Sequence, residues 1–150
     1  MKIIVMSDSH GHNELVKEVI KREPDADYYL HCGDLCSDER NFPDVLFVEG
    51  NCDFNDDLPK YRVVDCGSRR IYMTHSDRMW DRKNNLIELA KKKKCEIVCY
   101  GHTHIPSVEL YEGYWLVNPG ALSYNRDGSE PGYCQIDISD NDIQITRKVL

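Results

Sequence analysis

Five short hydrophobic runs of this chain each lead directly into polar side chains that can bind a metal ion. The runs are residues 3–6, 28–30, 45–48, 71–73 and 97–100, and the donors that follow them are, in order, Asp8 with His10, Asp34, Asn51, His75, and His102 with His104. Runs of this length are typical of buried β-strands. In sheets built from crossover connections, ligand crevices form at the carboxyl ends of the strands. We therefore predict that donors from five strand ends share one pocket.

Two of the runs are followed by a pair of donors separated by one residue, Asp8 with His10 and His102 with His104. On a strand, residues i and i+2 lie on the same side, so both members of a pair can reach one ion. Imidazole and carboxylate donors without a thiolate suit manganese, iron, cobalt, nickel or zinc better than calcium. A single pair is a weak signal, whereas the whole set, each at a strand end, indicates a site for two metal ions.

Asp34 and Asn51 each follow a glycine, which has no Cβ and lets the backbone turn sharply and approach an ion closely. These two residues are also ordinary turn residues, and Asp8 could form an Asx turn. His75 has the weakest local support, because a core or turn histidine would look the same in the sequence. Such structural alternatives apply to each residue alone, and the order of all the motifs favours the metal site.

Composition limits the classes of protein that remain. The 150 residues, 41% hydrophobic and 30% charged, fit one globular domain over residues 1–150. No run approaches the ~18 apolar residues that cross a bilayer, and the N-terminus lacks a signal peptide, so we expect a cytoplasmic protein without a membrane partner. The formal net charge of -7 disfavours a nucleic-acid polymer as partner, because such a protein needs a basic face. The oligomeric state stays open, a homo-oligomer included.

The cysteines do not suggest a disulfide framework. There are seven, an odd number, and none forms a Cys-x-x-Cys pair; they stand at positions 32, 36, 52, 66, 95, 99 and 134. We expect reduced and mostly buried thiols.

The hydrophobic periodicity changes along the chain, and this change indicates the fold class. Strands are expected near residues 2–7, 27–31, 44–49 and 96–100, helices at 13–22 and near 81–94, and a hairpin over 61–75. After His104 the pattern is a meander, with short strands near 107–112, 114–117, 132–138 and 142–149. Crossover units followed by hairpins predict an α/β protein in which two mixed sheets pack face to face with helices outside.

These motifs together resemble the calcineurin-like metallophosphoesterase superfamily, and within it the branch of small YfcE-like phosphodiesterases. The resemblance spans most of the chain and is carried by Asp8-Ser9-His10, Gly33-Asp34, Gly50-Asn51-Cys52-Asp53, Thr74-His75, Gly101-His102-Thr103-His104 and Asn118-Pro119-Gly120-Ala121. It implies a four-layer α-β-β-α sandwich of two mixed sheets, in agreement with the pattern of elements.

The resemblance also implies a role for each donor. Two divalent ions are expected, manganese in the first place, with nickel, iron, cobalt or zinc as alternatives. Asp34 would bridge the two ions, and the other ligands would be Asp8, His10 and His104 for the first ion and Asn51, His75 and His102 for the second. The implied activity is that of a phosphoric ester hydrolase, in which a hydroxide bridging the ions attacks phosphorus in line. The implied catalytic residues are Asp34, Asn51, Cys52 and His75.

Charge and residue 52 both favour a small phosphodiester as substrate. Two divalent ions and two ligand carboxylates leave a formal pocket charge of roughly +2. A hydroxide and a diester anion neutralise this charge, whereas a hydroxide and a monoester dianion make the sum negative. Many phosphomonoesterases of the superfamily have a histidine after the asparagine ligand, where this chain has Cys52. A thiol of pKa ~8.5 is a weak proton donor, so we expect diesters with acidic leaving groups.

Two other functions stay open. A phosphomonoesterase or protein phosphatase of the superfamily would use the same ligands, and a retromer subunit of the superfamily uses this fold as a non-catalytic, protein-binding scaffold. The chain departs from the family pattern at Ser76-Asp77, where relatives commonly have glycine and histidine. Asp77 is either an acceptor for a ligand or a solvated residue, and Asp53 is either such an acceptor or a helix cap. The natural substrate is not predicted.

Overall fold

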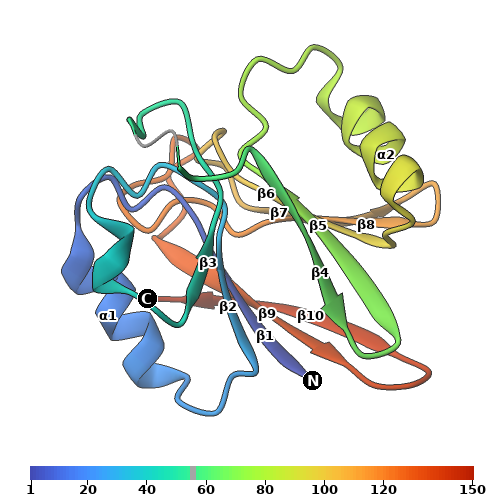
Figure 1. Ribbon diagram of the computed structural model, residues 1–150, viewed down its shortest axis with the longest axis horizontal. Coiled ribbons are helices and arrows are strands. Elements are labelled where there is room, and N and C mark those ends of the chain that lie inside the picture. Colours follow the sequence, from blue (N-terminus) through green and yellow to red (C-terminus); the bar gives the residue numbers. More distant parts are fainter. Residues whose placement is uncertain (55–56) are drawn as a thin grey trace.

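The computed structural model describes residues 1–54 and 57–150, and within these residues the strands form two five-stranded sheets (Figure 1). The first sheet has the order β10-β9-β1-β2-β3, with β1 (Lys2–Met6), β2 (Tyr28–His31), β3 (Val45–Phe47), β9 (Gly132–Ile138) and β10 (Ile143–Val149). The second has the order β4-β5-β6-β8-β7, with β4 (Tyr61–Cys66), β5 (Arg69–Thr74), β6 (Ile97–Tyr100), β7 (Ser107–Tyr111) and β8 (Tyr114–Asn118). The predicted pair of mixed sheets is confirmed.

Helices complete the outer layers of the sandwich. Helix α1 (Asn13–Arg22) packs Val16 and Val19 against the first sheet, and α2 (Arg82–Lys93) packs Leu86 and Ile87 against the second (Figure 1). A short 3-10 helix, η1 (Glu39–Asn41), follows β2. Neither α-helix in the described residues has the length and apolar character needed to cross a membrane. The order helix, sheet, sheet, helix is the predicted four-layer arrangement.

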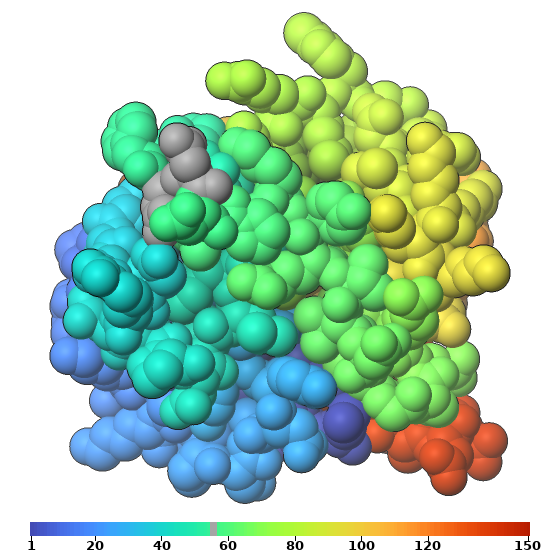
Figure 2. All heavy atoms as spheres, viewed as in Figure 1, coloured from blue at the N-terminus to red at the C-terminus, as the bar shows by residue number. Residues whose placement is uncertain are grey.

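Strand β1 shows why the hydrophobic runs are continuous and do not alternate with polar residues. Successive side chains of a strand point to opposite faces. Ile3 and Val5 lie in the core between the sheets, whereas Ile4 and Met6 lie in the core beneath α1. Both faces of β1 are therefore covered, and a polar residue on either face would lose its hydration. Space between the ribbons in Figure 1 is filled by side chains in the view of Figure 2.

The parallel strands set the position of the predicted site. In the first sheet β1 pairs in parallel with β2 and β2 with β3, and in the second β5 pairs in parallel with β6 and β6 with β8. Their carboxyl ends lead into loops that gather at one end of the sandwich (Figure 1). Antiparallel strands occupy three of the four edges, β10, β4 and β7, and the parallel strand β3 is the fourth. The donors that follow five of the parallel strands therefore lie at the same end of the sandwich.

A buried carboxylate just after α1 contacts side chains of three strands, β1, β9 and β10, at a distance from that end. Glu23, just after α1, is 4% exposed and accepts a hydrogen bond from the Tyr133 hydroxyl at 2.7 Å. Its two oxygens lie 2.7 Å from Lys2 Nζ and 2.6 Å from Lys148 Nζ. Burial alone would raise the pKa of Glu23, but Lys148, Lys2 and Tyr133 lower it from 4.5 to about 2. The folded protein therefore favours the ionised form of Glu23 more strongly than the unfolded chain does.

We predict that Glu23→Gln destabilises the protein in a pH-dependent way. Since the folded-state pKa lies below the unfolded value, the contribution of Glu23 is complete above about pH 4.5 and is lost as the pH falls toward about 2. Urea unfolding at pH 7 should show a loss of up to about 3 kcal/mol, shrinking below pH 4.5. The control Glu18→Gln, which removes the exposed pair with Arg22, should cost about 0.5 kcal/mol or less. A loss at Glu23 equal to that of the control, or independent of pH, would contradict this assignment.

Candidate metal centre

The first half of the site is formed by donors that follow β1 and β6. Oxygen or ring-nitrogen atoms of Asp8, His10 and His104 all lie within 4.8 Å of one another. His10 Nε2 is 3.2 Å from His104 Nε2, and Asp8 Oδ1 is 3.2 Å from His104 Nε2. Asp8 and His10 therefore meet His104 from a strand end of the other sheet. The expectation that each i, i+2 pair shares one side is wrong for His102 and His104, because both have positive φ and are not in extended strand conformation.

The second half is formed by donors that follow β2, β3, β5 and β6. Asn51 Oδ1 lies 2.9 Å from His75 Nε2 and 3.1 Å from His102 Nδ1. Asp34 Oδ2 lies 3.2 Å from His75 Nε2 and 3.6 Å from His10 Nε2, so this carboxylate touches both halves. All seven side chains proposed as ligands are thus in one continuous set of contacts, with Asp34 at its centre. His75, which had the weakest support in the sequence, is 1% exposed.

Two of the histidines are oriented by hydrogen bonds on their outer nitrogens. His75 Nδ1 donates to the Cys32 carbonyl at 2.8 Å, and His104 Nδ1 donates to the Tyr124 carbonyl at 3.1 Å. When Nδ1 carries the proton of a neutral imidazole, Nε2 presents a lone pair. In both residues Nε2 faces the carboxylates, which is the orientation that a metal ligand requires.

The electrostatics of the site fit a cation. Asp8 Oδ1 is buried and has no hydrogen-bond partner among the described residues. Burial would raise the pKa of Asp8, but the facing His10 and His104 lower it overall. Burial would also raise the pKa of Asp34, but His75 lowers it overall. Asp8 in turn raises the pKa of His10. Burial would lower the pKa of His75, but Asp34 raises it overall. Protons or metal cations can satisfy the same converging lone pairs, so this donor set suits divalent ions.

Glycines make room for the carboxylates of neighbouring strand ends. A Cβ on Gly50 would collide with Oδ1 and the backbone nitrogen of Asp34, and a Cβ on Gly101 would collide with Ser7 Oγ and approach Asp8. The sequence predicted that a glycine serves the ligand that directly follows it. Instead, Gly50 mainly admits Asp34 from the adjacent loop, a contact that is visible only once the strands are placed side by side.

Asp53 holds the loop that carries Asp34. Its carboxylate accepts hydrogen bonds from the backbone nitrogens of Asp34, Cys36 and Gly50, each at 2.8 Å. Of the two roles left open for Asp53, the structure supports an acceptor that positions a ligand. Asp77 lies at the rim, where it lines a cavity of about 340 Å³ together with Lys60 and Arg78.

The backbone at the site is held in conformations that side chains rarely adopt. Five of the seven proposed ligands have positive φ: Asp8 (54°), His10 (45°), Asp34 (57°), His102 (73°) and His104 (56°). Such conformations cost free energy and persist where surrounding contacts enforce them, often at functional sites. Asn118 holds the backbone around His102 in this way, because its Nδ2 donates to the Gly101 carbonyl at 3.3 Å and to Thr103 Oγ1 at 2.9 Å.

Two thiols stand beside the donors. Cys52 donates its backbone N–H to Asp34 Oδ1 at 2.8 Å, and desolvation and Asp34 raise the pKa of its thiol. Cys36 Sγ lies 3.5 Å from His10 Nδ1, and partial desolvation and nearby carboxylates raise its pKa to about 12. All seven cysteines are free, and five of them are buried. Cys36 was not predicted as a site residue; its only sequence signal is its place two residues after Asp34.

Comparison with known proteins identifies the family. A model of the calcineurin-like phosphoesterase superfamily domain matches residues 1–141. The probable metallophosphoesterase YsnB of Bacillus subtilis is 31% identical, over 98% of this chain and 89% of that protein. A crystal structure of a predicted phosphoesterase from Streptococcus pneumoniae is 33% identical, with a TM-score of 0.87 over 99% of this chain and 88% of that one. The chain therefore belongs to the calcineurin-like phosphoesterase superfamily, as the sequence motifs predicted.

Two more distant similarities extend the comparison. The phosphodiesterase YfcE of Escherichia coli K12 is 24% identical, over 91% of this chain and 88% of that protein. A crystal structure of a Vps29 variant from Entamoeba histolytica has a TM-score of 0.82 at 22% identity, over 98% of this chain and 91% of that one. At this identity the Vps29 likeness shows the fold alone.

We predict that Gly50→Ala weakens metal binding more than it weakens the fold. The added Cβ displaces Asp34, and the affinity for Mn²⁺ measured by calorimetric titration should fall about 10-fold or more. Gly113→Ala is the control: at φ 84° in the β7–β8 turn the alanine strains the backbone but meets no neighbouring atom, so stability should fall while Mn²⁺ affinity is kept. Unchanged Mn²⁺ affinity in Gly50→Ala, with the fold retained, would show that the close approach of Asp34 is not needed.

Proposed function

We propose that this protein is a metal-dependent phosphodiesterase that uses two divalent ions, with manganese as the first choice. The observation that carries the proposal is the contact of one buried carboxylate, Asp34, with both halves of the donor set. When bound, such ions supply hydroxide near neutral pH by lowering the pKa of water from ~15.7 toward ~7, and they neutralise charge on the phosphate. Asp8, His10 and His104 would hold one ion, and Asn51, His75 and His102 the other.

The protein groups around these donors have the task of orienting them. The carbonyls of Cys32 and Tyr124 fix which ring nitrogen of His75 and His104 faces the site. Asp53 fixes the loop of Asp34 through three backbone N–H groups. Preorganised ligands of this kind need little rearrangement when a phosphoester binds, which favours catalysis over mere ion storage.

Residue 52 supports a diester with an acidic leaving group. Cys52 adjoins both Asn51 and Asp34, which places it at the edge of the donor set. Its raised thiol pKa makes it a poor proton donor to a departing alkoxide. Aryl and similar leaving groups depart without such a proton. The relative YfcE is named a phosphodiesterase, which supports a diester as the substrate. The proposal also includes a cytoplasmic location.

The alternatives have less support. A phosphomonoesterase or protein phosphatase would benefit from a stronger proton donor than Cys52. A non-catalytic scaffold would not need seven donors held in contact, five of them at positive φ. The fold that the chain shares with Vps29 is compatible with a scaffold, but the retained donor set favours an enzyme.

The direct test is hydrolysis of a panel of aryl diesters, cyclic nucleotides and monoesters by protein loaded with Mn²⁺. We expect diester hydrolysis that a chelator abolishes and that Mn²⁺ restores. Asp34→Asn should lower both the bound Mn²⁺ and the rate to near background, whereas Asp65→Asn, on the exposed face of β4, should match the wild type. Full activity after chelation, or monoester turnover well above diester turnover, would overturn the proposal.

A second prediction concerns the leaving group. Cys52→His places a stronger proton donor beside Asn51, so turnover of diesters with alkoxide-like leaving groups should rise about 10-fold or more, while turnover of aryl diesters should change little. Cys52→Ser is the matched control and should give no such gain. If Cys52→His binds Mn²⁺ normally but gains nothing on poor leaving groups, residue 52 has no part in leaving-group chemistry.

A further inference from the structure

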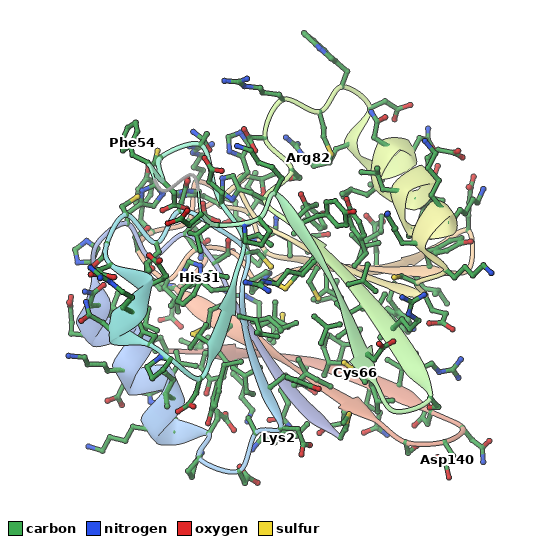
Figure 3. All side chains as sticks on the ribbon, viewed as in Figure 1. Lys2, His31, Phe54, Cys66, Arg82 and Asp140 are labelled. Atoms are coloured by element: carbon green, nitrogen blue, oxygen red, sulfur yellow. The ribbon has the colours of Figure 1, made fainter. Side chains whose placement is uncertain are left out.

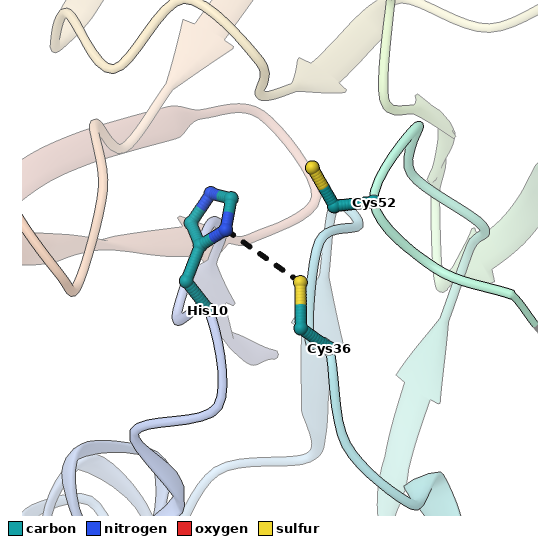
Figure 4. A group of neighbouring side chains, drawn as sticks. All are labelled: His10, Cys36 and Cys52. Carbon is teal, nitrogen blue, oxygen red and sulfur yellow. Dashed lines mark hydrogen bonds between the residues drawn. The ribbon is translucent and has the colours of Figure 1, made fainter.

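Cys36, Cys52 and His10 form a second group of donors beside the metal centre. Their two Sγ atoms and a ring nitrogen all lie within 4.8 Å of one another. Figure 4 shows the three side chains on separate loops, with Cys36 Sγ 3.5 Å from His10 Nδ1 and the Cys52 sulfur turned away from Cys36. Neither cysteine is in a disulfide. The set differs in chemistry from the centre itself, which has only oxygen and imidazole donors.

His10 presents its two nitrogens to two different sets of neighbours. Nε2 faces His104 at 3.2 Å and Asp34 at 3.6 Å, whereas Nδ1 faces the sulfur of Cys36. His75 and His104 use Nδ1 to donate to the backbone carbonyls of Cys32 and Tyr124. In His10 the corresponding partner is a thiol, which can itself be a metal ligand.

The spacing matches that of a tetrahedral site with sulfur and nitrogen ligands. With Zn–S of about 2.3 Å and Zn–N of about 2.0 Å, the nitrogen and sulfur ligands of a tetrahedral ion lie about 3.5 Å apart. His10 Nδ1 and Cys36 Sγ lie 3.5 Å apart. Cys52 Sγ lies within 4.8 Å of Cys36 Sγ and of a ring nitrogen of His10, and its side chain is only partly buried, so rotation about its Cα–Cβ bond would bring it to such an ion.

The group is also accessible. Cys36 and Cys52 line a cavity of about 650 Å³, which is bordered by η1 on one side and by Asp53 and Phe54 on the other. Phe54 is 97% exposed and projects away from the body of the protein (Figure 3). An ion can therefore enter from solvent without passing through the metal centre, and one coordination position would stay open toward the cavity.

We propose that Cys36, Cys52 and His10 Nδ1 form a binding site for one thiophilic ion of the zinc, cadmium or copper(I) class. Two thiolates select soft ions over manganese or magnesium. The site uses the other ring nitrogen of a proposed catalytic ligand, His10, so its expected effect on the catalytic ion rests on the proposed function. A neutral imidazole has one unprotonated nitrogen, so binding through Nδ1 removes Nε2 from the first catalytic ion. Occupation of the thiolate site should therefore weaken binding of that ion about 5-fold or more.

Cadmium titration of Mn²⁺-loaded protein, prepared without oxygen, tests the site independently of hydrolysis. Cadmium–thiolate bonds absorb in the ultraviolet, whereas oxygen and imidazole ligands give no such band. We expect the band to saturate at about one ion per chain and free Mn²⁺, measured by electron paramagnetic resonance, to rise with it. The double variant Cys36→Ser/Cys52→Ser should lose the band. Cys95→Ser, which alters a thiol beyond α2, should keep it.

Results of two kinds, from absorption and from mass spectrometry, would overturn the site. One is the absence of the thiolate band, or its persistence at full strength in the double variant with the fold retained. The other is a disulfide between Cys36 and Cys52 in protein kept free of oxygen, detected by mass spectrometry after alkylation. Because the readout is absorption and not turnover, failure here leaves the phosphodiesterase proposal standing, and failure of that proposal leaves the band unaffected.

Discussion

Two carboxylates, Asp8 and Asp34, are buried close together where the two sheets meet, and the rest of the site depends on keeping them there. They are 0% and 2% exposed, and one oxygen of each lies within 4.8 Å of the other and of a ring nitrogen of His75. Like charges buried at this separation repel each other strongly unless positive charge lies between or beside them. Imidazoles and backbone N–H groups provide part of that compensation, and divalent cations would provide the rest.

The fold meets this constraint with features that lie far apart in the sequence. Parallel strands of both sheets end at the same place, so ligands from the loops after β1, β2, β3, β5 and β6 meet there. Gly50 and Gly101 leave the space that Asp34 and Asp8 occupy. Asp53, itself buried, holds the loop of Asp34 without adding a ligand. These three residues keep the carboxylates in place although none of them would touch an ion.

Much of this could be predicted from the sequence, because the decisive signals are local. A hydrophobic run followed by Asp-x-His or Gly-Asp marks both the strand and the donor, and parallel strands share an edge. The contacts that orient the donors could not be predicted. Cys32 and Tyr124 contribute backbone carbonyls, which any residue has, and Gly50 serves a residue 16 positions away in the adjacent loop (50 − 34). Cys36 was missed because its partner, His10, lies on a different strand end.

In the proposed function one carboxylate, Asp34, joins two ions in a single centre. Electron paramagnetic resonance of the Mn²⁺-loaded protein tests it most directly, since ions that share a bridging ligand are magnetically coupled. The account predicts the broadened spectrum of a coupled pair at about two ions per chain, replaced by that of isolated Mn²⁺ when only one position is filled. A six-line spectrum of isolated Mn²⁺ at full loading would contradict it.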